Sequence, residues 1–239
     1  MQTLIIIPTY NEIENLQKLT ENIFLVLPQT NILVIDDDSP DGTGRLAQSL
    51  AGKNHKIKLI QRGGKSGLGS AYIRGFRYAL ENNYDFVFEM DADFSHNPKY
   101  LPEFLKQATQ YNLILGSRYI KGGGITEWGI LRKLISYAAN LYARIILGLP
   151  YRDLTGGFKC YSQAALRNLE LDSIICEGYG FQIETTYRIY RKGLSIKEIP
   201  IVFKGRRRGK SKISRKICFE AFWKVPLLRF RRIYPEPKY

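Results

Sequence analysis

The stretch YDFVFEMDADFSH, residues 84–96, ends an apolar run with two acidic residues spaced two apart. The apolar run predicts a buried strand over residues 84–90. In an extended chain, residues i and i+2 face the same side, so Asp91 and Asp93 would point the same way. Two free carboxylates so placed repel each other, and a divalent cation removes that conflict. The alternative is a solvated acidic turn, because short motifs often match by accident.

The composition favours oxygen ligands for such a cation. The chain has only two histidines, His55 and His96, and its three cysteines show no CxxC spacing. Oxygen ligands suit Mg²⁺ or Mn²⁺, and Mg²⁺ typically combines one or two carboxylates with substrate phosphates. We therefore expect Asp91 and Asp93 to face a metal–diphosphate complex, with His96 in a positioning role at most.

The first half of the chain alternates strand and helix patterns around this stretch. Strand-like apolar runs are predicted at residues 3–7, 31–36, 56–60, 84–90 and 112–117. Helical patterns separate them, the first with Asn11 as its expected N-cap. This alternation predicts an α/β fold, a mainly parallel sheet with helices on both faces. Ligands bind such sheets beyond the carboxyl ends of the strands, where Arg118 and the acidic motifs lie.

The alternation breaks after Arg118. The second half is predicted to form a flexible loop, a helix, a turn, a helix, a strand and a basic loop, at residues 121–124, 130–147, 153–158, 181–192, 194–203 and 205–212. A last helix follows, which Pro226 should kink or interrupt. No uncharged apolar run approaches the ~18 residues of a membrane-spanning helix.

Two motifs allow more than one interpretation. GGKSGLG, residues 63–69, is not a Walker A loop, because Leu59 stands where that motif needs its first glycine. Its glycines serve either a purely structural loop-to-helix turn or a loop near phosphates. The acidic run VIDDDSPDG, residues 34–42, either binds a base or ribose hydroxyl or forms an Asx-turn and helix cap.

The net charge of +14 is concentrated at the C-terminal end. Residues 204–239 carry 13 of the 36 basic and 2 of the 22 acidic side chains, a net of +11, whereas the first 203 residues carry +3. The last helix places one set of apolar residues on a single arc: Phe219, Phe222, Trp223, Pro226, Leu227 and Phe230. Such a basic amphipathic helix can lie in an anionic membrane surface, and the alternative is an ordinary helix that packs this stripe on the domain. The helix predicted at 130–147 is a second candidate contact.

Six motifs occur in order along the chain: PTYNE (8–12), VIDDDSPDGT (34–43), MDADFSH (90–96), GSRY (116–119), DLTGGFK (153–159) and IPIVFKGRRRGKSK (199–212). Together they resemble the motifs of dolichol-phosphate mannose synthases. The resemblance spans almost the whole chain and extends to inverting family-two glycosyltransferases with the GT-A fold. It implies transfer of mannose from GDP-mannose to a dolichyl or undecaprenyl phosphate, with inversion and with Mg²⁺ or Mn²⁺. On this basis we divide the chain into a catalytic domain, residues 1–213, and a membrane-contacting tail, residues 214–239.

The resemblance also implies roles for individual residues. The nucleoside end of the donor would be held by Pro8, Tyr10, Glu12, Ile35 and Asp37. The sugar diphosphate would lie against Asp91, Ala92 and Asp93, with the two carboxylates on the metal. Donor diphosphate or acceptor phosphate would be contacted by Arg118, Arg206 and Lys212, with Arg132 as a weaker acceptor candidate. Two positions depart from the pattern: Asp38 stands where relatives usually have Gly, and Ser95 stands where some have Gln as a third metal ligand.

The chemistry is coherent without the resemblance. A phosphate monoester is about 90% dianionic at pH 7, so as a nucleophile it needs no general base. It needs cations that bring two anions together and a metal that stabilises the leaving diphosphate. The alternatives are a UDP-glucose or other nucleotide-sugar transferase with the same lipid acceptor, a nucleic-acid-binding protein, and an inactive membrane adaptor.

The resemblance sets expectations for location and partners. We expect a cytoplasmic protein that binds peripherally to the cytoplasmic face of a bacterial inner membrane or of the endoplasmic reticulum. Membrane attachment would come from the protein itself or from a small anchor subunit. We expect no nucleic-acid partner, because the basic residues of the tail interleave with an apolar stripe.

Overall fold

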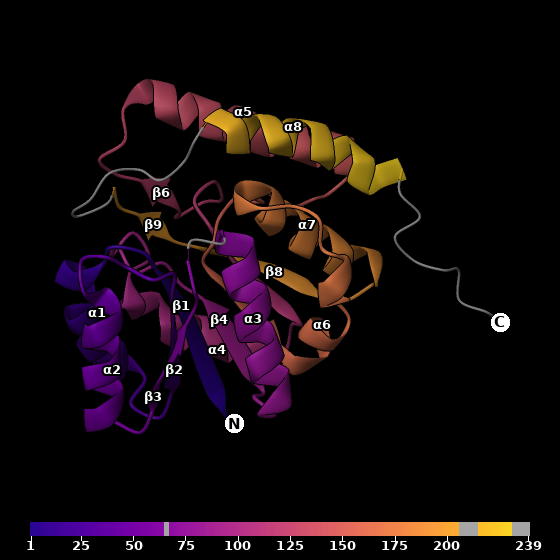
Figure 1. Cartoon of the computed structure of the whole chain (residues 1–239). Coiled ribbons are helices and arrows are strands. Elements are labelled where there is room, and N and C mark those ends of the chain that lie inside the picture. Colours follow the sequence, from indigo (N-terminus) through magenta and orange to yellow (C-terminus); the bar gives the residue numbers. More distant parts are fainter. Residues whose placement is uncertain (65–66, 206–214, 231–239) are drawn as a thin grey trace.

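The computed structural model of the chain describes residues 1–64, 67–205 and 215–230, with side chains of the last helix described from residue 222 onwards (Figure 1). Its first half alternates strands and helices as the sequence predicts. The elements are β1 (Thr3–Thr9), α1 (Ile13–Val26), β2 (Asn31–Asp36), α2 (Thr43–Lys53), β3 (Ile57–Gln61), α3 (Leu68–Glu81), β4 (Phe86–Glu89), a 3₁₀ turn (Pro98–Tyr100), α4 (Leu101–Ala108) and β5 (Leu113–Ser117).

The second half is less regular. Its elements are β6 (Gly124–Ile125), α5 (Ile130–Leu147), β7 (Lys159–Ser162), α6 (Gln163–Arg167), a 3₁₀ turn (Leu171–Ser173), α7 (Gly178–Arg191), β8 (Ile196–Pro200), β9 (Val202–Phe203) and α8 (Arg215–Phe230). The single strand predicted at 194–203 is therefore two strands. The predicted loop at 121–124 ends in β6, which pairs with β9 in a small parallel sheet.

Seven strands form the central sheet in the order β3-β2-β1-β4-β7-β5-β8. All neighbours are parallel except β7, which runs antiparallel between β4 and β5. The predicted mainly parallel α/β sheet is confirmed. The sequence analysis missed β7, because KCYS is too short for a periodic signal and becomes a strand only where two open strand edges flank it.

Both faces of the sheet are covered by helices, which explains the continuous apolar runs of the strands. In β1, Ile5 and Ile7 pack with α1, α2 and α4 on one face. Leu4 and Ile6, which alternate with them, pack with α3, α6 and α7 on the other face. The sheet is thus the middle layer of three, and apolar residues of its strands pack against the helices on both faces.

The start of α1 is capped from a distant loop and not by Asn11, which has a left-handed φ of 57°. The Ser39 hydroxyl accepts from the Asn11 N–H at 3.0 Å, and Thr43 Oγ1 accepts from the next N–H, of Glu12, at 2.9 Å. Asp41 Oδ2 accepts from the Ile13 N–H at 3.2 Å. The expectation of Asn11 as N-cap was wrong, because the loop after β2 supplies these acceptors and part of the acidic run is used in this cap.

α8 lies beside α5 across one end of the molecule (Figure 1). Val225 and Leu228 are buried against α5 and α7. In the described part of the helix the predicted apolar arc is largely exposed: Phe222 stacks on Tyr142 of α5, but Phe222, Trp223, Leu227 and Phe230 are all exposed. α8 also runs on through Pro226 without interruption. None of the helices in the described ranges is long and apolar enough to cross a bilayer.

Candidate active site

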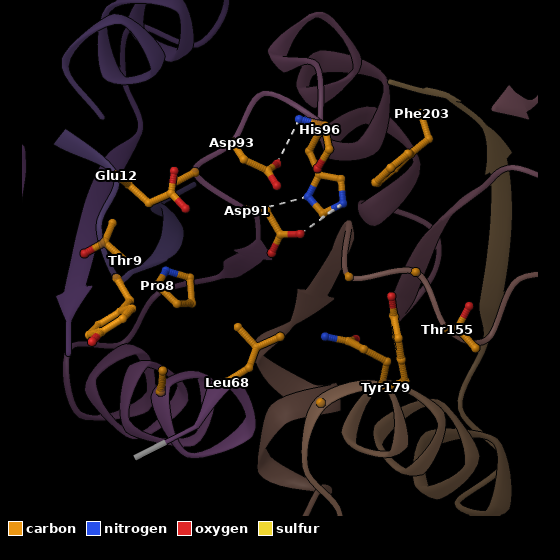
Figure 2. A pocket seen from close by; sticks show the side chains of 18 of the residues that line it. Pro8, Thr9, Glu12, Leu68, Asp91, Asp93, His96, Thr155, Tyr179 and Phe203 are labelled. Carbon is orange, nitrogen blue, oxygen red and sulfur yellow. Dashed lines mark hydrogen bonds and ion pairs between the residues drawn. The ribbon is translucent and has the colours of Figure 1, made fainter. Parts of the chain in front are cut away.

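A cleft of ≈ 270 Å³ opens at the carboxyl ends of the strands (Figure 2). It lies between β1 and β4, where the order of the strands in the sheet reverses direction. Such a switch point is the usual ligand site of an open α/β sheet. Most of the residues selected from the sequence line it: Pro8, Tyr10, Glu12, Asp37, Asp91, Ala92, Asp93, Arg118 and Arg132. Ile35 does not, because its side chain is buried in the core beneath the sheet. Arg206 and Lys212 lie outside the described residues.

Asp91 and Asp93 lie in a tight turn after β4, not on the strand itself. The Asp93 carboxylate accepts from the Ser95 N–H at 3.0 Å, and Phe94 between them has a left-handed φ of 64°. Both carboxylates nevertheless face the cleft, as Figure 2 shows. The predicted common direction therefore arises from turn geometry and not from the alternation of a strand.

His96 holds the Asp91 end of this turn. Its Nδ1 accepts from the Asp91 backbone N–H at 3.0 Å, so the ring proton resides on Nε2, which lies 3.9 Å from Asp91 Oδ2. The ring stacks on Phe158, with centroids 4.8 Å apart. Burial lowers the pKa of His96 to about 4, although Asp93 opposes the shift. The imidazole is therefore neutral near pH 7 and fixes the orientation of Asp91.

The donor set at this turn fits a divalent cation bound together with a phosphate ligand. Asp91 and Asp93 supply two carboxylates, and the buried Ser95 hydroxyl has no hydrogen-bond partner in the described part of the chain. The same ranges contain no cluster of three or more His, Cys, Asp or Glu side chains able to hold a metal. Two carboxylates with phosphate oxygens completing the shell are the usual arrangement for Mg²⁺.

Arg118 is fixed by a buried ion pair. Its Nε and Nη2 donate to the two carboxylate oxygens of Asp153, both at 2.7 Å, and Nη2 also donates to Thr155 at 2.8 Å. Burial disfavours the charged guanidinium, but Asp153 outweighs this effect and the pKa of Arg118 is raised. Asn140 of α5 holds the same turn by accepting from the Leu154 and Thr155 N–H groups. Arg118 therefore reaches the cleft as a rigid cation whose Nη1 makes no hydrogen bond to the described residues.

An aromatic wall borders the cationic end of the cleft. The Arg132 guanidinium lies 3.9 Å from the ring centroid of Trp128, and Arg118 lies 5.4 Å from that of Phe203. The β6–β9 ladder brings Trp128 and Phe203 together, with centroids 5.3 Å apart. The sequence analysis missed both aromatic residues, because nothing local signals a two-residue ladder between segments 78 residues apart.

Asp37, which the motif resemblance assigns to the nucleoside end of the donor, is paired with Arg62, which the sequence analysis also missed. Arg62 donates from Nε to Asp37 Oδ1 at 2.5 Å. It also donates to Ser70 Oγ and to the Gly67 carbonyl at the start of α3. Arg62 thus ties the end of β2 to the first turn of α3.

The glycines before α3 serve a close approach by Glu177. The Gly69 N–H donates to Glu177 Oε2 at 2.9 Å. A Cβ added at Gly67 or at Gly69 would lie 2.8 Å from that oxygen. A carboxylate therefore occupies the N-terminus of α3, the position at which a phosphate would bind. This geometry supports the structural interpretation of GGKSGLG, whose residues 65–66 lie outside the described ranges.

A buried polar network lies beneath the cleft. Lys159 Nζ donates to the Gln182 carbonyl at 2.6 Å and to the hydroxyls of two threonines of α7. Tyr161 donates to Glu89 Oε1 at 2.9 Å. Burial raises the pKa of Glu89 to about 7, opposed by Lys159, Gln182 and Tyr161. Burial lowers the pKa of Lys159 to about 8, opposed chiefly by Glu89. The network joins β4 and β7 to the helix that lines the cleft.

Known proteins resemble this chain in sequence and fold. Residues 4–170 match the model of glycosyl transferase family 2. An undecaprenyl-phosphate mannosyltransferase of Micrococcus luteus is 46% identical over 92% of this chain and 91% of its own length. A polyprenol monophosphomannose synthase of Mycolicibacterium smegmatis is 42% identical over 94% of this chain and 85% of its own length.

Solved structures share the fold at low sequence identity. Glucosyl-3-phosphoglycerate synthase of Mycobacterium tuberculosis with phosphoglyceric acid superposes with a TM-score of 0.69 at 16% identity, covering 99% of this chain and 81% of that one. The same enzyme with Mn²⁺, UDP-glucose and phosphoglyceric acid gives 0.67 at 17% identity, covering 94% and 79%. The architecture is the GT-A fold. The chain is a glycosyltransferase that belongs to glycosyl transferase family 2 and resembles its polyprenyl-phosphate mannose synthases.

Proposed function

We propose that this enzyme transfers mannose from GDP-mannose to a polyprenyl phosphate, with inversion, to give polyprenyl-phosphate β-mannose. The names of the two curated relatives support the sugar and the lipid acceptor. The donor nucleotide rests on the motif resemblance, in which Pro8, Tyr10 and Glu12 face the nucleoside. These three residues line one end of the cleft, and the carboxylate pair of the turn after β4 lies beside them.

One observation carries the choice of a lipid acceptor. The cationic end of the cleft, at Arg118 and Arg132, adjoins α5, because Arg132 belongs to the first turn of that helix. α5 exposes seven large apolar side chains: Ile130, Leu131, Leu134, Ile135, Tyr137, Leu141 and Ile145. A phosphate whose hydrocarbon chain extends along such a surface can therefore reach the guanidinium groups. A water-soluble acceptor would not need this surface.

The surface formed by α5 and α8 would contact a membrane. To the exposed residues of α5, α8 adds Phe222, Trp223, Leu227 and Phe230, next to the exposed Arg229. Exposed apolar areas of this kind usually mark an interaction site, and basic residues beside them favour an anionic lipid surface. We propose peripheral attachment through this surface, on the cytoplasmic face of the membrane that holds the lipid.

The described side chains match a transfer that needs no general base. The acceptor phosphate is already largely dianionic at pH 7, and His96 is neutral and occupied by Asp91. Arg118 is preorganised by Asp153 and Thr155, so it can hold a phosphate without reorganising during the reaction. Asp91 and Asp93 would hold Mg²⁺ or Mn²⁺, which would stabilise the charge of the leaving nucleoside diphosphate.

The test is a transfer assay with purified protein, polyprenyl phosphate in mixed micelles, Mg²⁺ or Mn²⁺, and labelled GDP-mannose or UDP-glucose. We expect metal-dependent label in the organic phase from GDP-mannose, and its loss in Asp93→Asn. NMR of the product would establish the anomeric configuration. Label from UDP-glucose alone would identify UDP-glucose as the donor and leave the proposed transfer to the lipid phosphate unchanged. Transfer to a short-chain water-soluble phosphate at the same rate as to the lipid would contradict the proposal that the acceptor is a polyprenyl phosphate.

A further inference from the structure

Gln182 is an unsatisfied polar side chain in the wall of the cleft. It lies near the start of α7, lines the cleft and is 2% exposed. Neither its Nε2 nor its Oε1 makes a hydrogen bond to the described residues. A buried amide without partners is destabilising, so native proteins rarely keep one without a reason.

The atoms around Gln182 show the same deficit. The Glu89 carboxyl is close enough for Gln182 to lower its pKa, yet no hydrogen bond of normal geometry joins the two side chains. Glu89 Oε2 and the buried Tyr72 hydroxyl also lack hydrogen-bond partners among the residues that the structure describes. Tyr72 is near enough to Asp91 and Glu89 for both to raise its pKa, in addition to the effect of its burial. Gln182, Glu89 and Tyr72 thus all carry polar atoms without partners in the described part of the chain, and their electrostatic effects on one another place them in one neighbourhood.

Gly157, which also lines the cleft, leaves room in front of Gln182. Gly157 faces it, and a Cβ added there would lie 3.5 Å from Gln182 Nε2 and 3.7 Å from His96 Cε1. These are ordinary contact distances, so a methyl group would fill a space that is free of protein atoms. The space borders His96, which orients the Asp91 carboxylate of the proposed metal site.

We propose that Gln182 binds a hydroxyl pair of the sugar that is transferred and thereby determines which hexose the enzyme accepts. The inference rests on the proposed function, since it assumes a nucleotide-sugar donor. An amide presents a donor and an acceptor side by side, which matches adjacent hydroxyl groups of a hexose. A site built to hydrogen-bond a hydroxyl discriminates strongly against analogues that lack it, because its buried groups are then left unpaired.

The test compares wild-type enzyme with Gln182→Leu on the nucleotide sugar that the wild type uses and on its 2-, 3-, 4- and 6-deoxy derivatives. We expect Gln182→Leu to raise KM for the intact donor or lower kcat/KM about tenfold or more, with unchanged affinity for the nucleoside diphosphate alone. For the wild type, one or two of the deoxy donors should have a much lower kcat/KM than the intact donor. For Gln182→Leu, the same deoxy donors and the intact donor should have similar kcat/KM values. Gln17→Leu on the exposed face of α1 is the matched control.

The thermal midpoint separates sugar binding from a structural role. Replacing an unpaired amide by an apolar side chain of similar size should leave the midpoint unchanged or raise it. If Gln182 instead stabilises Glu89 or a buried water, Gln182→Leu will lower the midpoint and keep the wild-type order of deoxy donors. That result would overturn the inference.

A second variant tests the same space without touching the amide. Gly157→Ala should raise KM for the sugar donor and leave affinity for the nucleoside diphosphate unchanged, whereas Gly52→Ala, where a Cβ meets nothing within 4 Å, should change neither. Unaltered donor kinetics in both Gly157→Ala and Gln182→Leu would overturn the inference while leaving the proposed function intact. A wild-type enzyme that transfers no sugar from any donor would overturn the proposed function itself.

Discussion

The Tyr142 hydroxyl of α5 donates a 2.8 Å hydrogen bond to the backbone carbonyl of Phe222 in α8. That carbonyl lies four residues before Pro226, which has no N–H to offer it. The ring of Tyr142 also stacks on that of Phe222, with centroids 5.0 Å apart. A side chain of one helix thus replaces the backbone bond that a proline removes from another, and α8 continues past Pro226.

Tyr142→Phe should weaken the docking of α8 while keeping the stacked rings. We expect a loss of about 0.5–1.5 kcal/mol, the net value of one hydrogen bond, seen as faster amide exchange in residues 222–230. In a Pro226→Ala background the same change should cost less, because the new N–H takes the Phe222 carbonyl. Equal costs in the two backgrounds would show that the hydroxyl does not compensate for the proline.

Asp153→Asn should destabilise the protein strongly. It removes the charge that pairs with Arg118 at two 2.7 Å contacts in a buried site and leaves a buried cation uncompensated. Breaking such a pair typically costs about 3–5 kcal/mol. Urea denaturation measures the change. Asp172→Asn is the matched control, since its pair with Arg77 is exposed and should be worth under about 1 kcal/mol.

Asp91→Asn and Asp93→Asn should each reduce metal-dependent turnover by about two orders of magnitude or more, because each would remove one of the two charged ligands of the proposed metal site. Isothermal titration of Mn²⁺ in the presence of GDP should show the matching loss of metal affinity. Glu21→Gln, an exposed acidic position on α1, is the control. Undiminished Mn²⁺ binding in both aspartate variants would place the metal elsewhere.

Ile135→Glu and Trp223→Glu should weaken binding to anionic vesicles. Their side chains are 58% and 70% exposed on the surface formed by α5 and α8, and burying a large apolar side chain in lipid is worth about 1.5–3 kcal/mol. Each change should therefore reduce co-sedimentation affinity about tenfold. Leu25→Glu, at a still more exposed leucine on α1, should have no effect. Equal losses in all three variants would argue against a specific docking surface.

Lys159 should contribute a pH-dependent part of the stability. Its folded pKa of about 8 lies below the unfolded value near 10.5, so the unfolded chain holds more protons between these limits. The free energy of unfolding of the wild type, relative to Lys159→Met, should therefore rise by about 3 kcal/mol as the pH increases from 8 to 10.5. Denaturation curves at four pH values measure this difference. A constant difference would mean that burial does not shift the Lys159 pKa.

The sheet and the region of the site were predictable for a simple reason. Strands covered on both faces need unbroken apolar runs, and β1, β2, β4 and β5 all have them. The first half of the fold followed from these runs. β7 and the β6–β9 ladder did not, because segments of two to four residues carry no periodicity and pair only where a distant strand edge is open.

The candidate site shows the same division. The end of β4 marked Asp91 and Asp93, but the direction of their side chains came from a left-handed turn at Phe94 and from the His96 ring. Ile35 follows the motif resemblance and yet is buried in the core. The position of a residue in a motif predicts which strand end it occupies. Whether its side chain faces the cleft or the core depends on how the helices pack on the sheet.

The α/β architecture, the strand ends at the cleft and the basic charge of the C-terminal region could all be inferred from the residue order. Apolar periodicity and charge are properties of the local chain, so they can be inferred from the residue order. The contacts between distant residues depend on tertiary packing and could not be inferred from the residue order. Asp153 pairs with Arg118, Gln182 lies near Gly157, and Tyr142 binds the Phe222 carbonyl, to which Pro226 offers no N–H. These partners lie 25 to 80 residues apart in the chain and come together only when the helices pack on the sheet and on each other.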